Sequence, residues 1–111
     1  MLTLTSEEQA WLDAYCRTVA SRFGDLVEET IVFGSKARGD ATEDSDLDIL
    51  IVIREGDWSV KDAVTEPGYT SSVGSAVVPS FMVLTRQEWD QDARERAPFW
   101  RTVTRDGVAV T

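Results

Sequence analysis

Residues 31–53 read IVFGSKARGDATEDSDLDILIVI, and this stretch decides the fold. An apolar run ends in the pair Gly34-Ser35, ten residues (36–45) follow, and Asp46-Leu47-Asp48 opens a second apolar run. Between residues 46 and 53 only the two aspartates are charged, and the remaining Leu, Ile and Val are typical of a central strand of a β-sheet. The first run, at 30–33, indicates a neighbouring strand.

The two aspartates predict a metal site. Asp46 and Asp48 should project from the same face of the strand, because side chains two residues apart point the same way. Two carboxylates this close repel each other, and burial strengthens the repulsion. A divalent cation removes that cost, and Mg²⁺ is commonly held by one or two carboxylates together with substrate phosphates. The pair therefore predicts Mg²⁺ with a phosphorylated ligand.

The turn after the first run predicts a phosphate-binding segment. Gly34 allows a sharp turn and a close approach of the backbone to a ligand. Ser35 is predicted to be the N-cap of a short helix, whose free amides would face a phosphate. Lys36 and Arg38 add positive charge, and an arginine can hold phosphate oxygens through two hydrogen bonds. The Gly-Ser pair alone carries little information, and an isolated Asp-x-Asp pair is ordinarily the solvated start of a strand. The two motifs in this order are far more specific for a functional site.

That combination resembles the signature of the DNA polymerase β-like nucleotidyltransferase superfamily. The fuller string FGSKARGD, followed by SDLD at 45–48, is similar to the minimal nucleotidyltransferase (MNT) domains of bacteria and archaea, which are often encoded beside a helical HEPN-domain protein. The resemblance implies an α/β (α+β) fold, with a small mixed β-sheet of three to four strands and helices packed on it. It implies one such domain over residues 1–111.

The resemblance also implies roles for the matched residues. Gly34 and Ser35 would bind the triphosphate of ATP or another nucleoside triphosphate, and Asp46 and Asp48 would hold two Mg²⁺ ions. The implied reaction transfers a nucleoside monophosphate, with AMP from ATP as the expected case, to a hydroxyl of a protein or small molecule. It further implies an antitoxin of a HEPN/MNT toxin–antitoxin pair, which modifies a tyrosine of its HEPN partner.

One departure from the family pattern concerns a third carboxylate, which active members usually carry on a later strand. The candidate strand, SAVVPSFMVL at 75–84, contains no Asp or Glu, and the matching position is Val78 or Ser80. Acidic residues elsewhere are expected to be surface charges rather than substitutes, namely Asp62, Glu66 and Glu88. The alternative function is therefore a catalytically weakened domain that binds nucleotide or masks a partner. A third hypothesis, a structural module without a nucleotide role, is disfavoured by the intact motif.

Composition narrows the classes of partner. The net charge of −9 and pI near 4.3 disfavour a nucleic-acid-binding surface, which needs a basic footprint. The chain has no histidine, which argues against zinc and excludes histidine acid–base chemistry, and its one cysteine cannot form an internal disulfide. No long apolar stretch or signal peptide is visible, so we expect a cytoplasmic protein with no membrane contact.

The remaining helices and strands are predicted from helix-capping residues and from helix-breaking Pro and Gly residues. We expect a helix that is capped by Thr5 or Ser6 and ends at Gly24, and a short helix at 58–65 that is broken by Pro67-Gly68. Residues 69–72 are predicted to be loop. A strand at 77–84 is followed by a helix capped by Thr85 that runs to about residue 97, a short helix at 99–104 and a final strand at 108–110.

The tryptophans are compatible with two structural roles. Trp58, Trp89 and Trp100 are too many to be all central core in so small a chain, and tryptophan is favoured at interfaces. Partial burial and an interaction surface on the C-terminal half are both compatible with this pattern. The family resemblance points to a HEPN-type partner, and a homodimer is the alternative.

Overall fold

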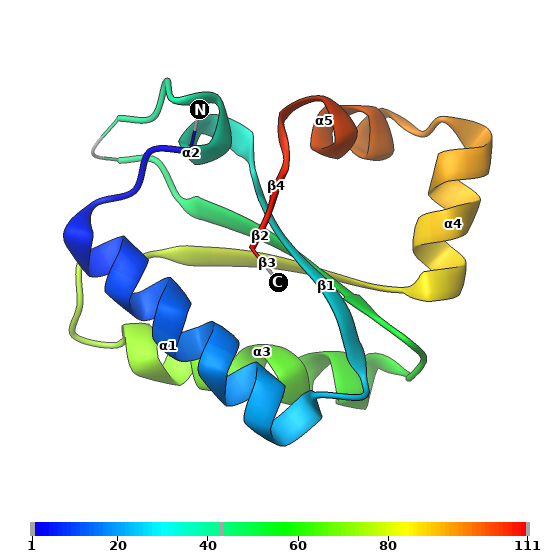
Figure 1. Ribbon diagram of the computed structural model, residues 1–111, viewed down its shortest axis with the longest axis horizontal. Helices are drawn as coiled ribbons and strands as arrows, with labels where there is room; N and C mark the ends of the chain where they lie inside the picture. The colour runs from blue at the N-terminus through cyan, green and yellow to red at the C-terminus, as the bar shows by residue number, and fades with distance from the viewer. Residues whose placement is uncertain (1, 43, 111) are drawn as a thin grey trace.

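A mixed β-sheet in the order β3-β2-β1-β4 forms the centre of the fold (Figure 1). The computed structural model describes residues 2–42 and 44–110. Along the chain the elements are α1 (Ser6–Phe23), β1 (Val27–Phe33), α2 (Gly34–Arg38), β2 (Leu47–Ile53), α3 (Trp58–Ser72), β3 (Pro79–Thr85), α4 (Arg86–Glu95), α5 (Pro98–Asp106) and β4 (Val108–Ala109).

β2 is a central strand of the sheet, as its apolar sequence predicts. It pairs antiparallel with β1 and parallel with β3, and β4 adds to the outer side of β1. Every residue of β2 except Asp48 is buried. The mixed sheet with packed helices confirms the predicted fold class. β1 begins at Val27, earlier than the predicted start at residue 30.

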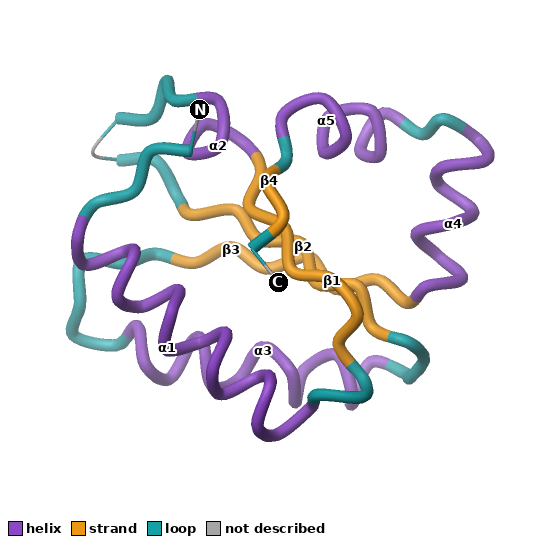
Figure 2. The backbone as a smooth tube through the Cα atoms, in the orientation of Figure 1, coloured by secondary structure: helices purple, strands orange, loops and turns teal. Residues whose placement is uncertain are grey.

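Two groups of helices cover opposite faces of the sheet, with the strands crossing between them (Figure 2). α1 and α3 pack on the face that carries Ile49, Ile51 and Ile53. α4 and α5 pack on the face that carries Leu50 and Val52. This alternation follows from the two-residue period of a strand, and it assigns Asp48 to the α4/α5 face.

Two helices begin with a reciprocal capping box; the sequence predicts the box at Thr85, and for α1 it predicts only a cap at Thr5 or Ser6. The Thr5 hydroxyl accepts a hydrogen bond from the Glu8 amide at 3.0 Å, and the Glu8 carboxylate accepts one from the Thr5 amide at 2.9 Å. Thr85 and Glu88 form the same reciprocal pair at the start of α4. Each box satisfies amides that have no partner inside the helix.

The predicted break at Pro67-Gly68 is wrong, because α3 continues through both residues to Ser72. Contacts with α1 hold this part of α3 in place: the Tyr15 hydroxyl donates to the Val64 carbonyl at 2.9 Å, and the Trp11 indole donates to the Gly68 carbonyl at 3.1 Å. Tertiary hydrogen bonds have overridden the local preference of the proline.

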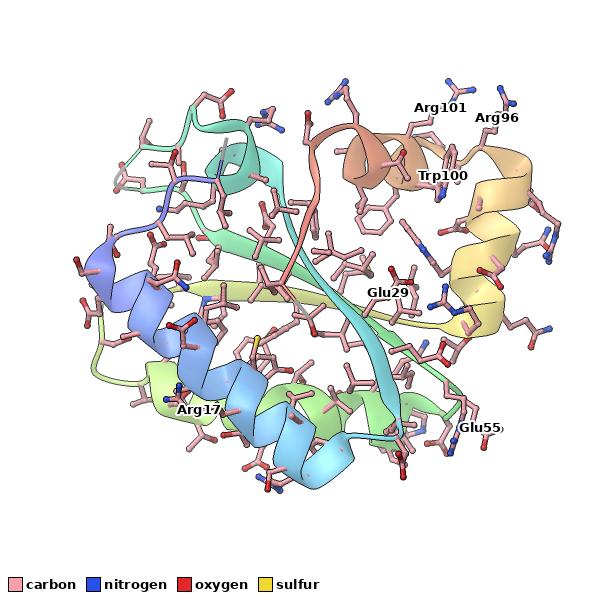
Figure 3. The ribbon with its side chains drawn as sticks, in the orientation of Figure 1. Arg17, Glu29, Glu55, Arg96, Trp100 and Arg101 are labelled. Carbon is pink, nitrogen blue, oxygen red and sulfur yellow. The ribbon has the colours of Figure 1, made fainter. Side chains whose placement is uncertain are left out.

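The tryptophans are divided between the core and the surface. Trp11 and Trp89 are buried, whereas Trp58 is 74 % exposed. Trp100 is half-buried at the junction of α4 and α5, where Figure 3 shows it beside Arg96 and Arg101. In the part of the chain that the structure describes, no helix is both long and apolar enough to span a membrane.

Candidate active site

The two predicted metal ligands lie on either side of the first residue of β2. Leu47 is fully buried, and its amide donates to the Val78 carbonyl at 2.9 Å, which fixes the start of the strand. Asp46, just before the strand, is exposed, and Asp48 is half-buried. Burial, followed by the negative charge of Asp46, raises the pKa of Asp48 above its usual range. The structure therefore brings the two carboxylates close enough to repel, as the sequence predicts.

Gly34 lies directly against Asp48. The backbone of Gly34 has φ +73°, in the left-handed region that glycine adopts easily. A Cβ atom at this position would overlap Oδ2 of Asp48 and would lie 3.2 Å from its Cγ. The pairing of Phe33 with Asp48 across β1 and β2 brings about this approach. Only glycine fits here, because any side chain would displace the carboxylate.

α2 starts two residues earlier than predicted. Phe33 occupies the N-cap position and makes no side-chain capping hydrogen bond, so the prediction that Ser35 is the N-cap is wrong. Ser35 instead belongs to the first turn of the helix, and its carbonyl accepts the amide of Gly39 at 2.9 Å. The left-handed conformation of Gly39, φ 88°, ends the helix.

The two predicted cations have different surroundings. The Lys36 side chain is buried, and its Nζ lies 3.0 Å from Oε2 of Glu8, so it ties α2 to α1. Arg38 is partly exposed and pairs with Asp40 at 3.2 Å and with Asp106 at 3.6 Å. Its positive charge also lowers the pKa of Asp48, against the larger effect of burial. The structure thus places Arg38 near the carboxylates and Lys36 in a contact between helices.

Asp106 is a residue that sequence reasoning missed. It lies at the end of α5, far from the motif in sequence, and its contact with Arg38 depends on how α5 packs beside α2. Arg105 and Arg38 together hold the pKa of Asp106 below its usual range, with Arg105 the larger cause. No local sequence signal could have revealed a contact of this kind.

Ser80 is the residue of β3 that faces Asp48. The parallel register pairs Asp48 with Ser80, and the Ser80 hydroxyl donates a hydrogen bond to the Asp48 carboxylate that lowers its pKa. Val78, the other predicted candidate, precedes β3 and is 56 % exposed. Ser80 therefore occupies the position where a carboxylate on this strand would meet the aspartate pair.

The acidic residues considered as substitutes are not placed to complete the site. Glu88 pairs with Lys61 at 2.7 Å beyond the end of β3, and the strand between Ser80 and Thr85 spans roughly 16 Å. Asp62 and Glu66 are exposed on α3, which packs on the opposite face of the sheet. Across the described ranges 2–42 and 44–110, no group of three or more Asp, Glu, Cys or His side chains could hold a metal.

A cavity of about 750 Å³ lies beside the site, between the segment before α1, α2 and the loop that leads to Asp46. Its lining includes Thr5, Glu8, Lys36 and Ser45, together with the exposed side chain of Val78. Neither aspartate of the pair contributes to it, so the cavity adjoins the carboxylates without containing them.

The chain is similar in sequence to known nucleotidyltransferases. A family model described as the nucleotidyltransferase domain matches residues 14–100. The protein adenylyltransferase MntA of Thermococcus cleftensis is 48 % identical over 56 residues, which is 50 % of this chain and 54 % of MntA. A Methanocaldococcus jannaschii protein assigned as a protein adenylyltransferase is 45 % identical over 47 residues, which is 42 % of this chain and 46 % of that protein. The matches span about half the length of these relatives.

The same likeness holds in three dimensions. The crystal structure of a Sulfolobus solfataricus protein assigned as a nucleotidyltransferase has a TM-score of 0.57 and 27 % identity, and the match covers 90 % of this chain and 76 % of that one. The family model covers most of the chain, including α2, β2 and the paired aspartates at the start of β2. On this evidence the chain belongs to the nucleotidyltransferase domain family.

Proposed function

We propose that this protein is a Mg²⁺-dependent nucleotidyltransferase that transfers AMP from ATP to a hydroxyl of a protein or small molecule. The observation that carries the proposal is the contact between Gly34 and Asp48. A glycine that lets the backbone approach a phosphate lies against a carboxylate suited to Mg²⁺, with a second carboxylate beside it. The names of the adenylyltransferase relatives support AMP as the transferred group.

Each residue of the site has a role in this proposal. Asp46 and Asp48 would hold Mg²⁺, which when bound stabilises negative charge in an in-line displacement at phosphorus. Gly34 and Ser35 bind the triphosphate through the backbone and the hydroxyl. Arg38, which is partly exposed near Asp48 and pairs with Asp40 and Asp106, would contact phosphate oxygens from the surface, whereas the ammonium of Lys36 is buried against Glu8. Lys36 then acts by fixing α2 rather than by contact with phosphate.

The chemistry balances as follows. The acceptor oxygen forms a bond to the α-phosphorus, the bond from that phosphorus to the bridging oxygen of the β-phosphate breaks, and pyrophosphate leaves. The acceptor also loses a proton. Ser80 has no carboxylate that could take it, so the proton passes to solvent.

The alternative is a domain that binds nucleotide or masks a partner without efficient turnover. Ser80, in the place of a third carboxylate, is the specific observation that favours it. In either case the expected partner is a HEPN-domain protein, in a toxin–antitoxin pair. Turnover therefore has to be measured separately from binding.

The test uses ATP labelled on the α-phosphate, Mg²⁺ and a HEPN-domain protein as acceptor. We expect label on the acceptor with the wild type, and none with the Asp46→Asn/Asp48→Asn double variant. Neutralisation of the acceptor's activity by both proteins, without label, would establish masking in place of transfer.

A further inference from the structure

β3 forms an edge of the sheet. In the order β3-β2-β1-β4 it has no neighbour on its outer side within the described residues. Every residue from Ser80 to Thr85 is at least partly exposed, in contrast to the buried β2 beside it. An edge strand of this kind presents main-chain donors and acceptors to another chain.

The parallel pairing with β2 decides which main-chain groups face outward. The Val78 carbonyl accepts from Leu47, so the even-numbered residues of β3 bond to β2. The odd-numbered residues therefore turn both their amide and carbonyl groups to the outside. Phe81 and Val83 are the two odd-numbered residues in the middle of the strand, and each presents one donor and one acceptor.

The two ends of β3 are already closed. Pro79 has no amide hydrogen to donate. The Thr85 amide is taken by the Glu88 side chain at 2.8 Å. A chain that pairs with this edge is thereby confined to the segment around Phe81 and Val83, which fixes its register relative to the sheet.

A small hollow lies beside this edge, between α3 and β3. It has a volume of about 230 Å³ and is lined by Lys61, Asp62, Thr65, Tyr69, Phe81 and Val83. Tyr69 is 46 % exposed, and its ring meets that of Phe81 edge-on, with 5.1 Å between the centroids. Tyr69, Phe81 and Val83 offer one apolar side chain a contact in the hollow, whose other side is polar, and recognition by strand addition uses such pockets for alternate side chains of the added strand.

The negative charge of the protein favours a basic segment over a second copy of the chain at the edge of β3. A second copy of this chain would also carry a net charge of −9, so two copies repel each other. On α3, Asp62 and Glu66 are exposed, whereas Lys61 is paired with Glu88. An extended segment that carries Lys or Arg beside its apolar residues fits this edge better than a second copy does.

An added strand would also run beside the candidate active site. Ser80 and Met82 lie on the same face as Asp48, and Met82 is 44 % exposed. Neighbouring strands are about 4.8 Å apart, so a strand beyond β3 would lie about 10 Å from β2. Side chains of that strand on this face would point over Ser80 toward the carboxylates.

We propose that the edge of β3 binds an extended basic segment of the protein acceptor as an added strand, with one apolar side chain in the hollow beside Tyr69. The segment presents the acceptor hydroxyl to Asp46 and Asp48, and this part rests on the proposed function. The binding itself requires only the edge, the hollow and the charge.

The test selects twelve-residue peptides from a random display library on the full chain. Val83→Pro removes one outward amide hydrogen and leaves the ladder to β2 intact, since prolines are tolerated on edge strands. Val83→Thr keeps that amide and is the matched control. We expect enriched peptides with alternating apolar and basic residues to bind the wild type and Val83→Thr within about twofold. Binding to Val83→Pro should be at least tenfold weaker, and bound peptide should slow hydrogen exchange of the Phe81 and Val83 amides.

Three results would overturn the proposal. The library could yield no peptide that is enriched on the wild type relative to Val83→Pro, or the enriched peptides could bind the two proteins equally well. The Phe81 and Val83 amides could also be protected from hydrogen exchange by self-association in the absence of peptide. Should Val83→Pro not fold, the enriched peptide with methylated backbone nitrogens takes its place. Methylation of the amides that face β3 should abolish binding, whereas methylation of the alternate amides should not. Titration of the wild type with Mg²⁺-ATP separates the two proposals. A wild type that binds the peptide but not the nucleotide would contradict only the proposed function.

Discussion

At the scale of single residues, the contact between Gly34 and Asp48 carries the site. Gly34→Ala should weaken Mg²⁺-ATP binding at least tenfold, because the added methyl group overlaps the Asp48 carboxylate. It should also cost roughly 1–2 kcal/mol of stability, the usual cost of a left-handed conformation in a residue other than glycine. Gly74→Ala is the matched control, since Gly74 has φ +80° and a Cβ there meets nothing within 4 Å. Equal nucleotide affinity in the two variants would contradict this role of Gly34.

The raised pKa of Asp48 predicts how stability depends on pH. Between the ordinary aspartate pKa near 4 and the raised folded value, the native state binds more protons than the unfolded state, so stability falls as pH rises through this window. Asp48→Asn removes the effect and should be more stable than the wild type above the window. The two proteins should converge at lower pH. Urea unfolding across pH measures this, and a variant less stable than the wild type at neutral pH would contradict it.

The lack of a carboxylate at Ser80 is expected to limit the rate of nucleotidyl transfer. Ser80→Asp places a third carboxylate beside Asp48 and should raise nucleotidyl transfer at least tenfold, because it adds a metal ligand and a proton acceptor. Ser80→Asn has nearly the same size without the charge and should give no gain. Initial rates with labelled ATP decide between them. A Ser80→Asp variant no faster than Ser80→Asn would mean that this position does not face the reacting groups.

At the scale of elements, the buried pair of Lys36 and Glu8 joins α2 to α1. Lys36→Met should destabilise the fold by roughly 3–5 kcal/mol, because Glu8 would be left buried and unpaired. Adding Glu8→Gln, which keeps an acceptor for the Thr5 amide, should recover much of that loss. Denaturant unfolding measures stability, and calorimetry on the folded double variant measures nucleotide affinity. A nucleotide affinity within about threefold of the wild type supports a structural role for Lys36. A tenfold loss of affinity would indicate that Lys36 contacts the phosphates.

The sequence predicted those parts of the molecule that depend on neighbours along the chain. Gly34, Asp46 and Asp48 lie in one local motif, and the cap at Thr5 and the capping box at Thr85 each depend on only four residues. The continuation of α3 past Pro67 depends on hydrogen bonds from Trp11 and Tyr15, which are more than 45 residues away. The choice of Ser80 over Val78 likewise required the register of β3 on β2.

At the scale of the whole molecule, net charge and fold act together. A net charge of −9 repels free ATP, so the protein should bind nucleotide only when Mg²⁺ accompanies it. The sheet places the carboxylates at the start of β2, in reach of α2 and the open edge of β3. In the proposed function, nucleotide and acceptor would approach one end of the sheet from different elements, which is the arrangement that a transfer between them requires.

The central claim is tested most directly by calorimetric titration of ATP, with and without Mg²⁺, into the wild type and the Asp46→Asn/Asp48→Asn variant. We expect saturable binding to the wild type that requires Mg²⁺ and is lost in the variant. Bound nucleotide at one hundred times its dissociation constant should also stabilise the wild type by about 2.7 kcal/mol. Binding that is independent of Mg²⁺, or unchanged in the folded variant, would contradict the assignment of these two aspartates as the metal-holding pair of a nucleotidyltransferase site.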